Sequence, residues 1–117
     1  MLVKLLKSKI HRATVTDANL DYMGSIAIDE NLMLQANLYE YEKVHILNLT
    51  NGSRLETYVI KADKNSGAVC VNGAAAHQVN IGDLIIVVSY CILDASGQVK
   101  NHFPDIVYVN QSNKIID

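Results

Sequence analysis

Hydrophobic and polar positions along this chain recur mostly at the two-residue period of β-strands. Short runs rich in β-branched and apolar residues, each bounded by turn residues, are expected to form strands. Such runs lie at residues 2–15, 26–28, 44–49, 55–60, 68–71, 83–93 and 106–109. Alternation is clearest in residues 44–49, whereas residues 83–93 are almost continuously apolar, which is typical of the strand at the core of a sheet. Turn signals roughly every ten residues complete the pattern of a small β-barrel.

Local signals between these strands predict turns and short helices. A helix is expected over residues 30–36, because Asp29 can cap its first turn and Asn37 tolerates the left-handed conformation that ends a helix. Asn51-Gly52 predicts a hairpin turn, since both residues accept a positive φ. A turn or a single helical turn is expected at residues 16–21, and one helical turn at 74–77. The expected fold class is therefore mainly β, with one or two short helices.

The composition describes a single domain, residues 1–117, that carries little charge. Half of the residues are hydrophobic and 19% are charged, so we expect partner subunits to cover some apolar surface. The net charge of -2 argues against non-specific binding of nucleic acid. Cys70 and Cys91 lie in apolar runs without CxxC spacing, which indicates small buried side chains in a reducing compartment.

The scattered histidines give little support for a metal site. The sequence shows neither the pattern of a signal peptide nor an apolar run of membrane-spanning length. These features predict a cytoplasmic protein that binds neither a metal nor a membrane.

The pair Gly24-Ser25 stands between a polar turn and an apolar strand, and by itself it predicts only another turn. A serine after a glycine can also cleave its own backbone, if the glycine lets the chain bend so that the hydroxyl reaches the glycine carbonyl carbon. The acyl group then moves from nitrogen to oxygen, elimination of the ester leaves dehydroalanine, and hydrolysis gives a pyruvoyl group. The products would be residues 1–24 and 25–117.

A pyruvoyl carbonyl can form a Schiff base with an amino acid and accept the electrons released when CO₂ leaves. Such a site needs a cation for the carboxylate that stays and an apolar wall beside the carboxylate that leaves. It also needs a proton donor over the resulting carbanion. Neither a metal nor an added cofactor is required.

Three segments carry a resemblance that covers nearly the whole chain. They are KIHRATVTDANLDYMGSIAID (residues 9–29), TNGSRLETYVI (50–60) and VNGAAAHQVNIGDLIIV (71–87). In combination they resemble the pyruvoyl-dependent aspartate 1-decarboxylases, which make β-alanine for pantothenate and coenzyme A biosynthesis. The resemblance implies a double-psi β-barrel and a homotetramer with active sites between adjacent subunits. It also implies that the chain is a zymogen that cleaves itself and then acts on L-aspartate through a Schiff base.

The resemblance also assigns roles to individual residues. Ser25 matches the pyruvoyl precursor, and Tyr58 matches the proton donor. Self-cleavage involves the positions that match Gly24, Ser25, Thr57 and Asn72. Arg54 and Lys9 match positions that hold substrate carboxylate. The remaining substrate-binding positions match Thr57, His11, Tyr22, Gly73, Ala74, Ala75 and Ile86.

Two alternative functions stay open at this point. The first alternative is a non-enzymatic barrel module for binding or assembly. Each residue taken singly has an ordinary structural interpretation, such as cross-strand packing for Tyr58 or exposed charge for Arg54. The second is a pyruvoyl decarboxylase for another amino acid. Arg54 and Lys9 favour aspartate, because a dicarboxylic substrate requires additional positive charge. The sequence does not indicate whether maturation is spontaneous or needs a helper protein.

Overall fold

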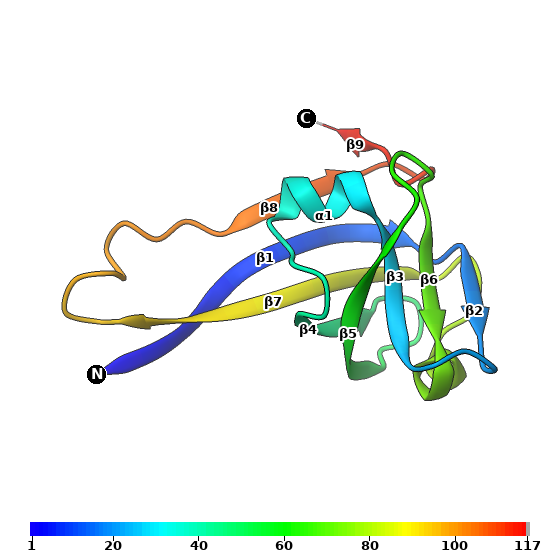
Figure 1. Cartoon of the computed structure of the whole chain (residues 1–117), viewed down its shortest axis with the longest axis horizontal. Helices are drawn as coiled ribbons and strands as arrows, with labels where there is room; N and C mark the ends of the chain where they lie inside the picture. The colour runs from blue at the N-terminus through cyan, green and yellow to red at the C-terminus, as the bar shows by residue number, and fades with distance from the viewer. Residues whose placement is uncertain (117) are drawn as a thin grey trace.

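The computed structural model describes residues 1–116, and β-strands make up most of its regular structure (Figure 1). In chain order the strands and helices are β1 (Leu2–Thr14), β2 (Asp17–Asn19), β3 (Ser25–Asp29), α1 (Glu30–Ala36), β4 (Lys43–Asn48), β5 (Arg54–Ala62), β6 (Val69–Asn72), the 3₁₀ helix η1 (Gly73–Gln78), β7 (Leu84–Asp94), β8 (Asp105–Val109) and β9 (Ile115–Ile116). The mainly β fold class expected from the sequence is confirmed.

The strands form one continuous sheet in the order β2-β6-β3-β5-β4-β7-β1-β8-β9. Three neighbouring pairs, β1–β8, β2–β6 and β3–β5, run parallel, and the others are antiparallel. Parallel neighbours need long connections, so strands that are distant in sequence meet side by side. This mixture brings β3, which begins at Ser25, between β5 and β6.

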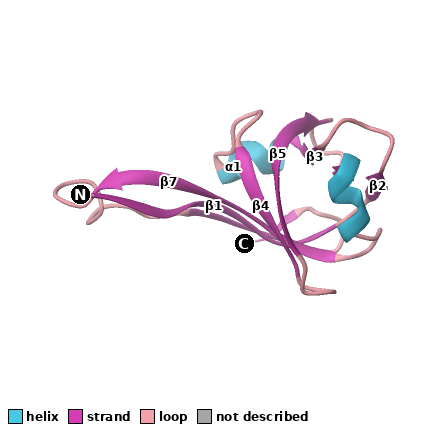
Figure 2. Cartoon of the chain, turned by 90° about the horizontal axis from the view of Figure 1, so that it is seen from below, coloured by secondary structure: helices cyan, strands magenta, loops and turns pink. Residues whose placement is uncertain are grey.

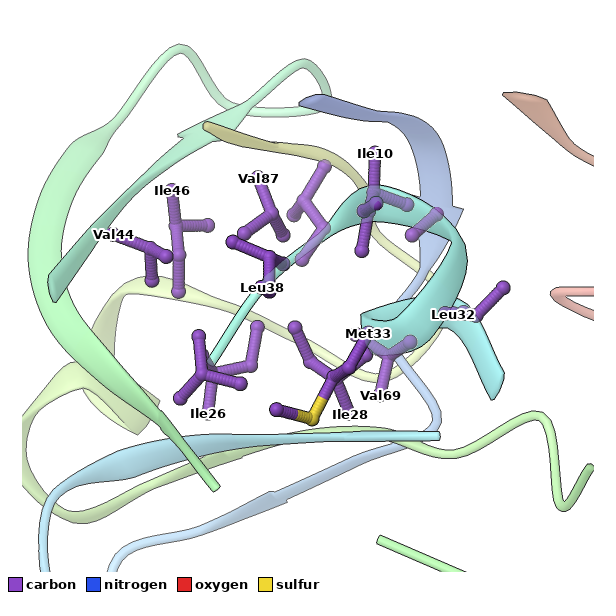
Figure 3. Close-up of a cluster of buried hydrophobic side chains, with 14 of the residues drawn as sticks. Ile10, Ile26, Ile28, Leu32, Met33, Leu38, Val44, Ile46, Val69 and Val87 are labelled. Carbon is purple, nitrogen blue, oxygen red and sulfur yellow. The ribbon is translucent and has the colours of Figure 1, made fainter. Parts of the chain in front are cut away.

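The sheet curls around aliphatic side chains, which point toward one another in Figure 3. Ile26, Ile28 and Ile46 are completely buried, and alternate residues of these strands face inward as the two-residue period requires. Helix α1 covers this core with its apolar face, formed by Leu32, Met33 and Ala36. Burying an aliphatic side chain of this size stabilises a fold by about 1.5–3 kcal/mol, so the core fixes how β3 lies against its neighbours.

Strands β1 and β7 extend beyond the barrel as a two-stranded ribbon, seen in Figures 1 and 2. β8 pairs only with Ser8–His11 of β1, so the ribbon pairs Leu2–Leu6 with residues 90–94 alone. Leu2, Ile92 and, in the loop after β7, Phe103 expose large apolar side chains there. An isolated two-stranded ribbon is marginally stable in water. The exposed apolar surface is as the composition led us to expect, and its burial by partner subunits stays a prediction.

Helix α1 begins and ends as predicted. Asp29 accepts a hydrogen bond from the Asn31 N–H at 2.8 Å, and Asn37 ends the helix with a φ of 58°. The same carboxylate accepts from the N–H groups of Asn65 and Gly67, each at 2.8 Å. Asp29 therefore joins the helix to the loop before β6.

Several local predictions were wrong or incomplete. Residues 16–21 contain strand β2, because the Thr16 backbone and hydroxyl bond to Val69 and start a parallel pairing with β6. Asn51-Gly52 connects the antiparallel pair β4 and β5 as predicted, although only Gly52 has a positive φ, at 77°. The helical turn expected at 74–77 is present within the 3₁₀ helix η1, and a short strand, β9, follows the last one predicted. Cys70 and Cys91 are free thiols that are half-buried and not fully buried.

The helices described in residues 1–116 are all too short or too polar to cross a membrane. The same residues bring together no group of three side chains of the types that commonly bind metal ions.

Candidate active site

Gly24-Ser25 lies where the chain enters β3, and the start of β3 pairs there with the end of β6. Ser25 pairs with Asn72 in the antiparallel β3–β6 ladder, and both side chains are buried. The Asn72 amide donates a hydrogen bond from Nδ2 to Ser25 Oγ at 3.2 Å. A serine next to an exposed glycine thus has a buried hydroxyl with a fixed donor beside it. This hydrogen bond occupies one of the two lone pairs of Ser25 Oγ and leaves the second lone pair and the O–H group free.

Gly73 holds the chain segment before Ser25 in place from the opposite side. It has a φ of 69°, and a Cβ built on it would lie 2.6 Å from Gly24 Cα and 2.7 Å from Gly24 N. Only glycine fits such a close approach of two backbones. We expected the unusual backbone conformation at Gly24, but Gly24 has no positive φ and a Cβ there would meet nothing within 4 Å. The constraint on the Gly24-Ser25 bond therefore comes from Gly73.

A cavity of about 280 Å³ opens beside Ser25 and Asn72. Its other lining residues are Tyr22, Met23, Tyr41, Tyr58 and Ile60. Tyr58 and Ile60 share one face of β5 by the two-residue period of a strand, which explains why both border the cavity. The lining residues from the described part of the chain are all uncharged, so the cavity is a largely apolar pocket with a few hydroxyl and amide groups.

Thr57 lies close to this cavity without lining it. β3 and β5 run parallel with Ile26 opposite Val59, so the pairs Gly24-Ser25 and Thr57-Tyr58 lead into the same end of that strand pair. Successive side chains of a strand point to opposite faces, and Thr57 therefore faces away from the side that carries Tyr58. Ala74 and Ala75 follow Gly73 in η1 at the end of β6.

The predicted substrate cations are not in this cavity. Arg54 and Ile86 border a separate cavity of about 380 Å³ at the β4–β5 turn. Lys9 is half-buried in the middle of β1, where it pairs with Val88 and Ile106. One chain by itself therefore brings together Tyr22, Ser25, Tyr58 and Asn72, and leaves Arg54 and Ile86 elsewhere.

His11 borders a third cavity, of about 430 Å³, against Tyr108. The two rings meet edge to face with centroids 5.6 Å apart, and His11 Nδ1 is buried without a hydrogen-bond partner in residues 1–116. Desolvation, followed by the nearby charges of Lys9 and Arg12, lowers the pKa of His11 below its ordinary value. The imidazole is consequently neutral near pH 7.

Three lining residues were not predicted from the sequence: Met23, Tyr41 and Ile60. Ile60 could have been found, because it lies two positions after Tyr58 on the same strand. Met23 directly precedes Gly24, which is a weaker signal. No sequence pattern indicated Tyr41, since its position at the cavity depends on a φ of 72° that is unusual for a tyrosine.

The fold resembles that of a rationally designed double-psi β-barrel protein, with a TM-score of 0.50 and 15% sequence identity. The match covers 66% of this chain and 90% of the designed one. At this identity the likeness shows the fold alone. The chain is thus a double-psi β-barrel protein, as the resemblance implied.

The sequence comparisons define the family. The profile of a family described as aspartate decarboxylase matches residues 1–116. An aspartate 1-decarboxylase of Caldicellulosiruptor bescii is 57% identical over 116 residues, covering 99% of this chain and 90% of the relative. One from Campylobacter fetus is 57% identical over 115 residues, covering 98% of each. The chain belongs to the aspartate decarboxylase family and is an enzyme, so the non-enzymatic barrel module is set aside.

Proposed function

We propose that this enzyme decarboxylates L-aspartate to β-alanine and CO₂, using a pyruvoyl group that it makes from Ser25. The observation that carries the proposal is the environment of Ser25. The residue is a buried serine directly after glycine, its hydroxyl is held by Asn72, and Tyr58 borders the same apolar cavity. β-Alanine formed in this way supplies pantothenate and coenzyme A biosynthesis, and we place the reaction in the cytoplasm.

Self-cleavage requires the atoms of this chain and one water molecule. Ser25 Oγ attacks the Gly24 carbonyl carbon, its proton passes to the departing amide nitrogen, and an ester replaces the peptide bond. Loss of the Ser25 α-proton then breaks the Cβ–O bond and frees Gly24 as a carboxylate. Water finally replaces the nitrogen, which leaves as ammonia. Asn72 orients the hydroxyl through its 3.2 Å hydrogen bond, and we assign Thr57 to the Gly24 carbonyl.

Two properties of the cavity support a pyruvoyl group at Ser25: its apolar wall and the hydroxyl of Tyr58. Such a group supplies an electrophile for the substrate amine and an acceptor for the electrons that CO₂ leaves behind. Tyr22, Met23 and Ile60 give the apolar wall that favours loss of a charged carboxylate as neutral CO₂. The Tyr58 hydroxyl holds the proton that the product carbon receives. The backbone of Gly73, Ala74 and Ala75 borders the substrate at the start of η1.

The carboxylate that remains on the substrate needs a cation, and we propose that an adjacent subunit supplies it. Arg54 and Lys9 lie outside the Ser25 cavity of their own chain. In a homotetramer with active sites between subunits, Arg54 and Lys9 of one copy would complete the cavity of the next. His11 and Ile86 would enter the site in the same way.

A mixing experiment tests the shared site. Ser25→Ala and Arg54→Ala chains should each be inactive as homotetramers. If Arg54 acts across the interface, tetramers re-formed from a mixture of the two contain some sites with an intact Ser25 and an intact Arg54. Such mixtures should regain β-alanine formation, whereas mixtures of Ser25→Ala with itself should not. Failure of fully exchanged mixtures to regain activity would contradict the assignment of Arg54 to the adjacent subunit.

The test of the proposed function is a denaturing intact-mass spectrum followed over time on warm, purified protein. We expect fragments 1–24 and 25–117, with the larger lighter by one ammonia than a chain that begins with Ser25, and β-alanine when aspartate is added. Ser25→Ala should stay whole. A larger fragment with an ordinary serine amino terminus would contradict the pyruvoyl group. Cleavage only after addition of a cell extract would show that a maturation helper is needed.

A cleaved protein that releases no β-alanine would instead indicate a pyruvoyl decarboxylase for another amino acid. Direct assay of the other amino acids for CO₂ release would then identify the substrate class.

A further inference from the structure

Within residues 1–116, five residues other than glycine have a positive φ, and two of them are unexpected. Asn37, Asn65 and Asn113 are asparagines, which tolerate the left-handed conformation. The exceptions are Arg12 and Tyr41, with φ values of 64° and 72°. For a bulky side chain this conformation reduces the ratio of folded to unfolded protein by roughly 5- to 30-fold. A residue retained at such a cost has a role that asparagine or glycine would not fill.

Three backbone hydrogen bonds hold the segment around Tyr41. Its N–H donates to the Val59 carbonyl at 2.6 Å, and the Val59 N–H donates to the Glu42 carbonyl at 3.0 Å. The Glu42 N–H closes the turn by donating to the Tyr39 carbonyl at 3.1 Å. This segment joins α1 to β4 and lies beside β5 (Figure 1). The backbone of Tyr41 is therefore held against β5, the strand that also carries Tyr58.

Burial does not explain Tyr41. Its side chain is 72% exposed, so it contributes little to the core, and yet it borders the cavity around Ser25. An exposed residue that also lines a cavity lies at its opening. The turn would form equally well with asparagine, which would leave that side of the opening without a ring.

We propose that Tyr41 sets the size of the opening to the Ser25 cavity and so determines which amino acids reach the reactive group. Tyr41 borders the same cavity as Ser25 and Asn72, and from its exposed position it narrows the entrance for substrates longer than aspartate. This assignment rests on the proposed function for its substrate, but the access that it predicts can be measured on the assembled protein before any cleavage.

Access can be measured without cleavage or catalysis. A Ser25→Cys chain is treated with methyl and benzyl methanethiosulfonate, and labelling is mapped peptide by peptide. Only peptides that keep the bond between positions 24 and 25 are scored, because this thiol can attack the Gly24 carbonyl as the serine does. Cys70 and Cys91 provide internal controls, since both are free and lie outside the cavity lining. Adding Tyr41→Asn should raise the benzyl-to-methyl labelling ratio at the new cysteine by roughly tenfold. Tyr41→Phe, which keeps the ring, should leave that ratio unchanged.

Stability gives a second measurement with the opposite sign from an ordinary loss of packing. Tyr41→Asn should raise Tm by about 4 °C, because asparagine accepts the left-handed conformation. Tyr39→Asn is the matched control: it removes an exposed tyrosine of the same turn that neither lines the cavity nor has a positive φ. Tyr39→Asn should leave the labelling ratio unchanged and should not raise Tm. In the active enzyme, Tyr41→Asn should reduce the preference for aspartate over glutamate in kcat/KM.

An unchanged labelling ratio in Tyr41→Asn, with or without a gain in Tm, would overturn the proposal. A wild-type chain that stays whole even after addition of a cell extract would contradict the proposed function and leave the labelling result valid. The two failures are therefore distinguishable.

Discussion

Substitution of Gly73 by alanine tests whether this glycine holds the cleavage site in position. The added Cβ would lie 2.6 Å from Gly24 Cα and 2.7 Å from Gly24 N, both backbone atoms that cannot turn away as a flexible side chain can. Its nearest other contact, the Tyr22 carbonyl oxygen at 3.1 Å, belongs to the same segment. The segment before Ser25 must therefore move as a unit.

Two costs add up in Gly73→Ala. The left-handed conformation, with a φ of 69°, costs alanine about 1–2 kcal/mol. Overpacking against Gly24 costs a further 1–3 kcal/mol or so, giving a total of about 2–5 kcal/mol. Moving Gly24 Cα from 2.6 Å to an ordinary contact distance of 3.4 Å requires a movement of about 0.8 Å. A displacement near 1 Å in a reacting group can slow a reaction by about 100-fold. Self-cleavage should therefore slow much more than the loss of stability alone implies.

Gly82→Ala is the matched control, because Gly82 has a φ of 92° and a Cβ there would meet nothing within 4 Å. It should lose about 1–2 kcal/mol from the conformation alone and cleave at the wild-type rate. Denaturant unfolding of each variant in a Ser25→Ala background gives the stabilities, and intact-mass time courses with Ser25 present give the rates. Equal losses of stability in the two variants, together with equal cleavage rates, would refute the role of Gly73.

Three further substitutions probe the hydrogen bonds and the proton donor. Asn72→Ala removes the donor to Ser25 Oγ and should slow self-cleavage with a loss of about 1 kcal/mol in unfolding free energy; cleavage at the wild-type rate in mass spectra would contradict this role. Tyr58→Phe should cleave normally but decarboxylate slowly, and full activity with aspartate would remove Tyr58 as the donor. Burial acts to raise the pKa of Asp29, but three backbone N–H donors outweigh it and hold that pKa below its ordinary value of 3.8. The charged form is thus the stabilising one: its contribution is complete above pH 3.8 and is lost as pH falls through the lowered pKa in the folded protein. Asp29→Asn should reduce the free energy of unfolding by about 1.5–3 kcal/mol at pH 7, and that free energy should fall less in acid than it does in wild type. Equal acid sensitivity of the two proteins in denaturant titrations would contradict this.

Most of the fold could be predicted from local patterns. The alternation in residues 44–49 and the apolar run at 83–93 correspond to β4 and β7, because side-chain period and burial decide strand formation directly. The cap at Asp29 and the exit at Asn37 were also readable, since each depends on one side chain and its own backbone. The parallel pairs were not readable. β2 forms beside β6, where Thr16 exchanges hydrogen bonds with the backbone of Val69, more than fifty positions away.

The candidate site shows the same division between local and long-range information. The motifs named Ser25, Asn72 and Tyr58, which line one cavity, but they carried no information on which of the other named residues one chain brings to that cavity. Arg54 lies only four positions before Tyr58 on β5 and yet borders a different cavity. Strand geometry explains this, because four residues of a strand span roughly 13 Å.

Conflict between local preference and observed conformation identifies the parts of this site that motifs miss. Within residues 1–116, asparagine occupies three of the five non-glycine positions with a positive φ. At these three positions the fold agrees with the known tolerance of asparagine for that conformation. It departs from local preference at Arg12 and Tyr41, and each of these residues borders a cavity that contains a predicted site residue, His11 or Ser25. Sequences that specify one structure are expected to violate local preferences mainly where function requires it. The coincidence at both positions therefore supports a functional origin for the strain, and the Tyr41 substitutions measure it at the cavity where the chemistry is proposed to occur.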